Sequence, residues 1–275
     1  MKRIPLALSL AIVFLGVSFL LYPTISNFVN ERTQSIAIAE YEQATHNLEA
    51  NQRQKLLDDA LSYNAELVEK YSRFTLSEED MQKYNLVLDI SQTGIMGYIK
   101  IPKLHVDLPI YHGIEEGTLQ VAVGHVPGSS FPVGGPSTHC VLSGHSGLPS
   151  AYLFTDLDQL SLKDRFEITV LDETLIYEVD QIVTVLPQEL NYLEIEDGKD
   201  LCTLVTCTPY GVNTHRLLVR GHRIYESDLT ESTLIDNGNQ NTFTLFPGIL
   251  LLGGIAFLLV FIIYIHRKKV TKESQ

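Results

Sequence analysis

Long apolar stretches lie near both ends of the 275-residue chain. Residues 4–22 and 243–265 contain no charged side chain. Each stretch is long enough to cross about 30 Å of hydrocarbon as a helix, so the pattern predicts two transmembrane helices. A cleavable signal peptide is the alternative for the first stretch, but its apolar core is long and no small-residue cleavage site follows Leu20. We therefore expect an uncleaved anchor there.

After the first apolar stretch the pattern is that of amphipathic helix. Residues 28–72 lack Pro and Gly, and their apolar positions recur three or four apart. The positions concerned are Leu57, Leu61, Leu67, Val68 and Tyr71. Thr75 with Glu78, and Ser77 with Asp80, have the spacing of N-terminal caps for a second, short helix that reaches about Tyr84. Residues 28–88 are thus predicted to form a helical arm, with residues 72–77 as a connector.

From Gly94 onward, short β-branched and apolar runs alternate with Gly, Pro, Asp and Asn. Seven or eight strands at this spacing indicate a mainly β fold, with a closed or nearly closed barrel over residues 89–226. Asp172-Glu173 is expected to be a two-residue hairpin turn. The predicted strands are Met96–Ile101, Val106–Tyr111, His139–Ser143, Phe166–Val170, Leu175–Val185, Leu201–Thr206 and Leu217–Ile224.

Charge adds an orientation. Basic residues flank both apolar stretches on their outer sides, which predicts that both ends of the chain are cytoplasmic and that residues 23–242 lie outside. The chain is then divided into an anchor (1–27), the arm (28–88), the barrel (89–226), a polar tether (227–242), a second transmembrane helix (243–266) and a basic tail (267–275). The external part carries 14 basic and 32 acidic side chains, a net charge of −18, which argues against nucleic acid as a partner.

Three cysteines lie in the external part, so at least one thiol has no intramolecular partner. Cys207 ends a β-rich run beside a Thr-Pro-Tyr-Gly turn, where substrate could reach it. Cys202 points to the opposite face of the same strand, because side chains alternate along a strand. Cys202 and Cys140 lie inside apolar runs and are expected to be small buried hydrophobic residues.

A histidine and an arginine could complete a thiol acyl-transfer site. His145 stands between glycines at a predicted strand end, and Arg216 begins the strand that follows Cys207. In an antiparallel pair that start faces the end of the preceding strand. A thiolate attacks, a histidine moves protons and an arginine binds an oxyanion. Other histidines, together with Arg220 and Arg223, remain open by position alone. No spacing fits a common zinc module, and no cysteine lies two residues from Cys207 to serve a redox pair.

Several segments of residues 89–223 resemble the class C, pilin-polymerising sortases of Gram-positive bacteria. They include Met96–Pro102, Leu108–Gly113, Gly144-His145, Leu148–Ala151, Leu153–Leu157 and Thr203–Val219. The resemblance implies a sortase-type closed eight-stranded β-barrel with His145, Cys207 and Arg216 as the catalytic set and no cofactor. It further implies cleavage of an LPxTG-like sorting signal through a thioacyl intermediate, which a pilin lysine resolves. The implied location is the cell membrane, with two spans and an extracellular catalytic domain.

One segment departs from that pattern. Class C enzymes usually carry a lid with an Asp-Pro-aromatic anchor, and this chain contains no Asp-Pro. The lid position falls in residues 72–76, where only Phe74 could imitate the aromatic part. We therefore expect a degenerate, weakly held or absent lid. Phe74 packed against Cys207 would contradict this expectation.

Three other functions remain open from the sequence. The same fold could anchor surface proteins or pili to cell-wall peptidoglycan, and a hydrolytic cysteine protease would transfer the acyl group to water. A membrane-tethered β-barrel adhesin or binding module would leave Cys207, His145 and Arg216 without a chemical role.

Overall fold

The computed structural model describes residues 3–70, 72–90 and 93–225. The predicted tether, second transmembrane helix and basic tail, residues 227–275, lie outside these described residues.

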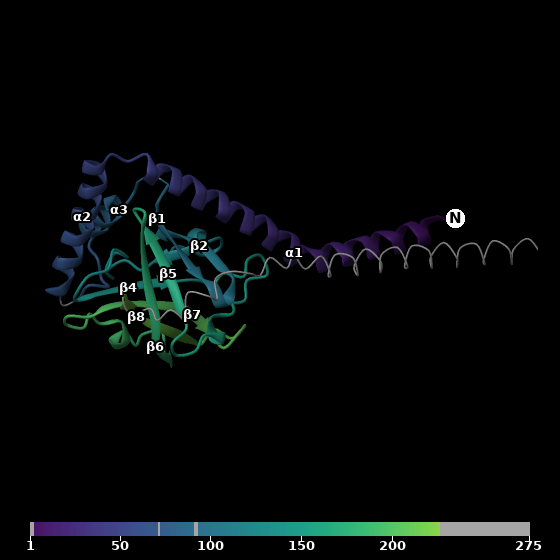
Figure 1. Cartoon of the computed structure of the whole chain (residues 1–275). Helices are drawn as coiled ribbons and strands as arrows, with labels where there is room; N and C mark the ends of the chain where they lie inside the picture. Colours follow the sequence, from purple (N-terminus) through teal and green to yellow (C-terminus); the bar gives the residue numbers. More distant parts are fainter. Residues whose placement is uncertain (1–2, 71, 91–92, 226–275) are drawn as a thin grey trace, which may run out of the picture. The chain divides into compact units, whose positions relative to one another are not determined.

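Eight strands close into a barrel in the order β1-β2-β3-β4-β7-β8-β6-β5, which confirms the predicted mainly β fold (Figure 1). Only the β2–β3 and β4–β7 pairs are parallel among the described strands. The strands are β1 (Ile95–Ile101), β2 (Val106–His112), β3 (Val123–His125), β4 (Thr138–Ser143), β5 (Arg165–Val170), β6 (Glu173–Val185), β7 (Asp200–Thr208) and β8 (His215–Ile224).

Two local features differ from the sequence prediction. Strand β3 was not predicted, because a run of three residues is too short to show alternation. The hairpin between β5 and β6 turns at Leu171 and Asp172, both with positive φ, one residue earlier than expected. Positive φ at both central residues matches the twist of the flanking strands, which is why such a turn closes a two-residue hairpin.

The barrel interior is the main hydrophobic core. Side chains alternate in and out along each strand, so one face of β7 joins the core while the other faces outward. Cys202 and Leu204 are fully buried in this core, as are Cys140 and Leu142 of the neighbouring β4. A separate apolar cluster of Val141, Val185, Leu193 and Leu218 covers part of the outer face.

The N-terminal arm consists of three helices. Helix α1 (Arg3–His46) contains Pro23, and α2 (Ala50–Val68) and α3 (Glu78–Leu86) follow it. Within the described residues, one helix is long and apolar enough to cross a membrane, with a candidate span at Ala11–His46. The predicted cap at Ser77 is confirmed, because its hydroxyl accepts the Asp80 N–H at 3.1 Å. The predicted apolar face of α2 is only partly right, since Leu61 and Val68 are exposed.

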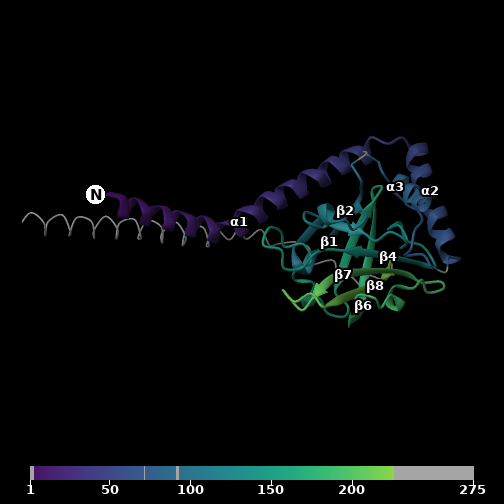
Figure 2. The same ribbon diagram turned by 180° about the vertical axis from the view of Figure 1, so that it is seen from behind.

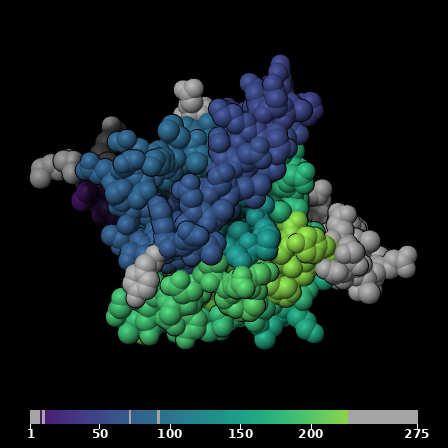
Figure 3. All heavy atoms as spheres, turned by 90° about the vertical axis from the view of Figure 1, so that its left-hand side faces the viewer, coloured from purple at the N-terminus to yellow at the C-terminus, as the bar shows by residue number. Residues whose placement is uncertain are grey.

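Polar contacts fasten the arm to the barrel. The buried Tyr41 hydroxyl of α1 donates to the Met96 carbonyl at 2.8 Å and accepts the Leu171 N–H at 3.0 Å. Asn64 of α2 exchanges two hydrogen bonds with the backbone of Phe131. Figure 3 shows the indigo and blue atoms of the arm lying directly against the teal and green atoms of the barrel, and Figure 2 shows the same elements from behind. The arm is therefore packed against the barrel and hydrogen-bonded to it.

Two short helical pieces lie in the connections that leave β2 and β4. Helix α4 (Glu116–Leu119) connects β2 to β3, and a single 3-10 turn (Leu157–Gln159) follows β4. Further 3-10 turns are Pro102–Leu104 and Asn191–Leu193.

Candidate active site

Cys207 and Arg216 are direct cross-strand neighbours. Strands β7 and β8 pair antiparallel in a register that sets Cys207 opposite Arg216. Directly opposite residues project from the same face of a sheet, with their Cβ atoms about 4.5–5.5 Å apart. The predicted pairing of the end of one strand with the start of the next is therefore found, and both side chains are half-buried on the outer face.

The segment after β4 brings His145 to the same end of the sheet. Strand β4 runs parallel to β7, with Ser143 opposite Val205. Beyond that pair the Gly144 N–H donates to the Val205 carbonyl at 3.0 Å, and the Thr206 hydroxyl donates to the Gly144 carbonyl at 2.7 Å. Continuing this alignment by two residues brings His145 level with Cys207. The three predicted residues therefore gather on three adjacent segments.

A cavity of about 300 Å³ opens beside Cys207. Its lining combines the ends of β7 and β8 with the loop that follows β4. Tyr210, which is 70% exposed, flanks it from the β7–β8 turn. The lining residues are Ser146, Thr155, Asp156, Asp158, Gln159, Thr206, Cys207, Thr208, Tyr210 and Leu217. The cysteine is thus accessible to a substrate chain from outside the barrel.

His145 lies in a place that fixes its backbone but leaves its ring free. Its carbonyl accepts the Phe154 N–H at 3.1 Å, and the Phe154 ring fills the space where Gly144 would carry a Cβ. Its Nε2 atom is buried and has no hydrogen-bond partner. The Glu116 carboxylate is 3.7 Å from this nitrogen, close enough for an ion pair but too far for a hydrogen bond. A buried polar atom without a partner is rare in folded proteins, and a catalytic role is one of the reasons for which such an atom is kept.

Arg216 is held by its own loop. Its Nη1 group donates to the carbonyls of Asn213 at 3.2 Å and His215 at 3.0 Å. Among the carboxylates of residues 3–70, 72–90 and 93–225, none lies within ion-pair distance of its guanidinium. The guanidinium is therefore positioned by backbone oxygens, and its positive charge is not neutralised by a neighbouring acid.

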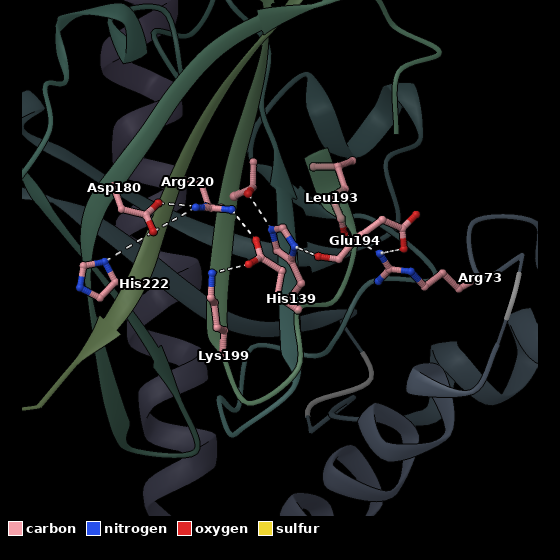
Figure 4. Close-up of polar contacts among 10 residues, drawn as sticks. Arg73, His139, Asp180, Leu193, Glu194, Lys199, Arg220 and His222 are labelled. Carbon is pink, nitrogen blue, oxygen red and sulfur yellow. Dashed lines mark hydrogen bonds and ion pairs between the residues drawn. The ribbon is translucent and has the colours of Figure 1, made fainter. Parts of the chain in front are cut away.

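The two other candidate arginines, Arg220 and Arg223, make contacts within the fold. Arg220 bridges strands and loop: it donates to Asp180 at 2.9 Å and to Glu196 at 2.7 Å (Figure 4). Arg223 lies over the ring of Tyr177. Arg220 therefore differs from Arg216, whose charge has no carboxylate partner in the described chain, and Arg223 differs by its packing on an aromatic ring.

Two competing histidines are also structural. His139 is fully buried; its Nδ1–H donates to the Glu194 carbonyl at 2.7 Å and its Nε2 accepts from the Thr203 hydroxyl at 2.7 Å (Figure 4). Burial lowers the pKa of His139 to about 4, so it is neutral near pH 7. His125, likewise buried, is hydrogen-bonded to the arm through Tyr84. Across the described chain no group of three or more His, Cys, Asp or Glu side chains is arranged to hold a metal ion.

The connector at residues 72–77 is attached more firmly than expected. Arg73 is buried, and its guanidinium donates to the Leu193 carbonyl at 2.5 Å and to Glu194 at 3.2 Å (Figure 4). Phe74 packs against the outer apolar cluster around Val141. The expectation of a weakly held segment is therefore wrong at Arg73. Phe74 is not among the described residues that line the Cys207 cavity.

Two neighbours of the site were missed by sequence reasoning. Glu116 lies on a short helix outside the segments of the resemblance, and a single acidic residue there gives no signal. Asp156 lines the Cys207 cavity. It lies within the Leu153–Leu157 segment of the resemblance, which was the available signal, although position alone gave it no role.

Comparisons with known proteins agree with this architecture. Residues 99–224 match the family model of the sortase domain. The crystal structure of sortase C1 from Streptococcus agalactiae is 49% identical, covers 69% of this chain and 98% of its own, and has a TM-score of 0.66. Sortase C from Streptococcus pneumoniae is 39% identical, with coverages of 69% and 96% and a TM-score of 0.63. Sortase A of Streptococcus agalactiae serotype III is 24% identical over 72% of this chain and 75% of its own.

Each of the two solved structures is more than one-third identical to this chain over almost its whole length. The strand order of the barrel also brings Cys207, Arg216 and the His145 segment together. The chain therefore belongs to the sortase family, in its class C, and is a cysteine transpeptidase.

Proposed function

We propose that the chain is a membrane-anchored transpeptidase that cleaves an LPxTG-like sorting signal at Cys207 and joins it to a lysine of a pilin subunit. The observation that carries the proposal is the cross-strand pair of Cys207 and Arg216 at the edge of an open cavity, with His145 on the adjacent segment. These are the groups that thiol acyl transfer requires.

The chemistry follows from the positions of the three side chains. The Cys207 thiolate attacks the carbonyl of the Thr–Gly bond and forms a tetrahedral oxyanion. The guanidinium of Arg216 donates to that oxygen, and its charge is available because no described carboxylate pairs with it. His145 gives a proton to the departing glycine amine, and its free Nε2 is suited to this step. A lysine amine then attacks the thioester and releases the isopeptide product.

Two observations favour pilin over a cell-wall amine as the acceptor. The Streptococcus pneumoniae relative is described in terms of its pilin substrate specificity, and a further neighbour, 38% identical, is described as sortase C1 of GBS pilus island 1. The predicted external part is also strongly acidic, which favours lysine-bearing partners. Wall anchoring remains the second candidate, since it would use the same thioester with a peptidoglycan amine.

The test uses the full-length chain in detergent micelles with a pilin that carries an LPxTG-type signal. Intact mass measurement is expected to show a covalent adduct on the chain, and gel electrophoresis is expected to show pilin multimers that resist denaturant. Both products should disappear in Cys207→Ala. Cys202→Ala is the matched control on the same strand and should retain both.

The outcomes separate the acceptors. An adduct that yields no multimers, but is released by a peptidoglycan-type amine, would assign the chain to wall anchoring. Release by water alone would indicate a protease. If the wild-type chain forms no adduct, the assignment of Cys207 as nucleophile is wrong.

A further inference from the structure

The two cysteines that the proposed reaction does not use are direct neighbours inside the barrel. Strands β4 and β7 pair in a register that sets Cys140 opposite Cys202. Neighbouring strands lie about 4.7–4.9 Å apart, within the window of about 4.4–6.8 Å between Cα atoms that a disulfide requires. Opposite residues project from the same face, so both thiols enter the same core.

The surroundings direct the two sulfur atoms toward each other. The neighbour of Cys202 on its other side is Gly221 of β8, which has no side chain, and the ring of Phe166 fills the space beside that glycine. The side chains of Cys140 and Cys202 interact with one another, and both are buried.

His125 makes the pair chemically unequal. Its ring nitrogens hydrogen-bond to Tyr84, Ser129 and Ser130, and the ring lies close enough to Cys140 to favour a negative charge on that sulfur. Burial alone would raise the pKa of Cys140, but its interactions with Cys202 and His125 outweigh burial and lower it. Burial raises the pKa of Cys202. Cys140 is therefore the thiol that ionises first, and a thiolate is the form that attacks a disulfide.

We propose that Cys140 and Cys202 form a disulfide that joins β4 to β7 in the mature protein and leaves Cys207 as its single free thiol. This inference goes beyond the transpeptidase reaction, and it rests on the proposed location of the barrel outside the cytoplasm, where disulfides form and persist. A fully buried pair is oxidised most readily while the exported chain is still folding, before the barrel closes.

The oxidant is a small-molecule or protein disulfide outside the cell. The Cys140 thiolate attacks one sulfur of that disulfide and displaces a thiolate, which takes up the proton that Cys140 lost. Cys202 then loses its proton, attacks the mixed disulfide at Cys140 and releases the second thiol. Two S–H bonds and one S–S bond are broken, two S–H bonds and one S–S bond are formed, and two electrons pass to the oxidant.

The bridge would fix the register of β4 against β7, and this register sets the relative positions of His145 and Cys207. Cys140 precedes His145 by five residues, and Cys202 precedes Cys207 by five residues on the paired strand. A bond between the first pair prevents β4 and β7 from sliding or separating below the second pair. It also removes the two thiols that could otherwise exchange with Cys207 while the chain folds.

The test counts thiols in the full-length chain taken directly from membranes. Cells are quenched in acid, the chain is unfolded and treated with N-ethylmaleimide before or after reduction, and its intact mass is measured. One adduct is expected before reduction and three after. Trypsin leaves Cys202 and Cys207 on one peptide, residues 200–216, so Cys207→Ala is needed to assign the free thiol. That variant should show no adduct before reduction and two after.

The matched control is Cys202→Ala, which should show two adducts under both conditions. Reduction of the purified wild-type chain is expected to lower its melting temperature by roughly 5–15 °C, because removal of the bridge lets the unfolded chain expand. Three adducts before reduction in the wild-type chain would overturn the proposal. An adduct count of one that does not fall in Cys207→Ala would also overturn it, because Cys207 would then be in the bridge. The wild-type count decides the matter even if a variant fails to fold.

Discussion

Strand β7 carries two cysteines five residues apart, and the fold gives them opposite environments. Cys202 is fully buried in the barrel core beside Cys140, whereas Cys207 is half-buried on the outer face beside Arg216 and a cavity. Both belong to the same strand and differ only in face and in distance from its end. The comparison shows that two residues of the same type on one strand receive opposite burial and opposite neighbours from the face on which each lies.

The outer face itself is layered. Nearest the start of β7 is a polar layer, in which His139 is hydrogen-bonded to Thr203, and Arg220, opposite Thr203, binds Glu196. Above it the apolar cluster that includes Leu218 packs against Phe74. Cys207 and Arg216 form the last layer, at the strand ends. The first two layers hold the loop between β6 and β7 through Leu193, Glu194 and Glu196, whereas a cavity lies beside the third.

Replacing each of the two cysteines in turn is expected to give the largest difference in activity. Cys207→Ala should lower turnover by at least about 10⁴-fold, because the nucleophile is lost. Cys202→Ala should lower the free energy of unfolding while each folded molecule keeps its activity. Single-turnover adduct formation, normalised to the folded fraction, measures both. Equal losses in the two variants would contradict the division of the strand into a chemical and a structural cysteine.

The next comparison is between two arginines on β8. Arg216→Lys should lower kcat/KM by about 10²–10³-fold, because lysine cannot reproduce the planar donor geometry toward the oxyanion. Arg220→Lys is the matched control; it should mainly weaken the contacts with Asp180 and Glu196 and change the stability. If Arg220→Lys costs more kcat/KM than Arg216→Lys, the assignment of Arg216 to the oxyanion is wrong.

The polar layer predicts a pH effect on stability. The pKa of His139 is about 4 in the folded chain and about 6.5 when unfolded, so folding favours the neutral ring. Its contribution is fully present above pH 6.5 and is lost as the pH falls toward 4; the loss is about 3 kcal/mol. Urea unfolding followed by tyrosine fluorescence, possible because the chain has 13 tyrosines and no tryptophan, gives the slope.

The control for that slope is His139→Gln. The carboxylates of the chain titrate in the same pH range in both proteins, so the difference between wild type and variant isolates the histidine. Identical slopes would show that His139 is not held neutral by its burial.

The smallest expected effect concerns the contact that aligns the two site segments. Thr206→Val removes the 2.7 Å hydrogen bond from the Thr206 hydroxyl to the Gly144 carbonyl. The free energy of unfolding should fall by about 1 kcal/mol, and turnover by a few-fold, because His145 is then less firmly placed. Thr206→Ser is the control and should restore most of both. An equal loss in Thr206→Ser would mean that packing of the methyl group, not the hydrogen bond, is responsible.

Local sequence patterns predicted the helices and strands of this molecule better than they predicted which of these elements pair or pack together. Seven strands and the cap at Ser77 were found from alternation and capping chemistry. The pairing of Cys207 with Arg216 followed from the antiparallel turn between them, because such a turn fixes both strands at once.

Contacts between distant segments could not be read in the same way. His145 was identified only through family resemblance. Its place beside β7 depends on a parallel pairing of β4 with β7, which are separated by 56 residues, and no local pattern reports such a pairing. Arg73 was expected in a loose connector because its binding site, the Leu193 carbonyl, is 120 residues away. Glu116 carried no sequence signal for its position near His145.

Three amide side chains of helix α1 form hydrogen bonds with loops of the barrel. Asn30 donates to the Ser150 carbonyl, Asn27 accepts the Tyr152 N–H and Gln34 donates to the Val121 carbonyl. With α1 as the proposed anchor, a rise of about 1.5 Å per residue places Asn30 only about 12 Å beyond Tyr22, the last residue of the uncharged stretch. The loop after β4, which lines the Cys207 cavity, is thereby tied to the part of α1 that follows the apolar stretch, so the helix sets the spacing between the proposed anchor and the cavity.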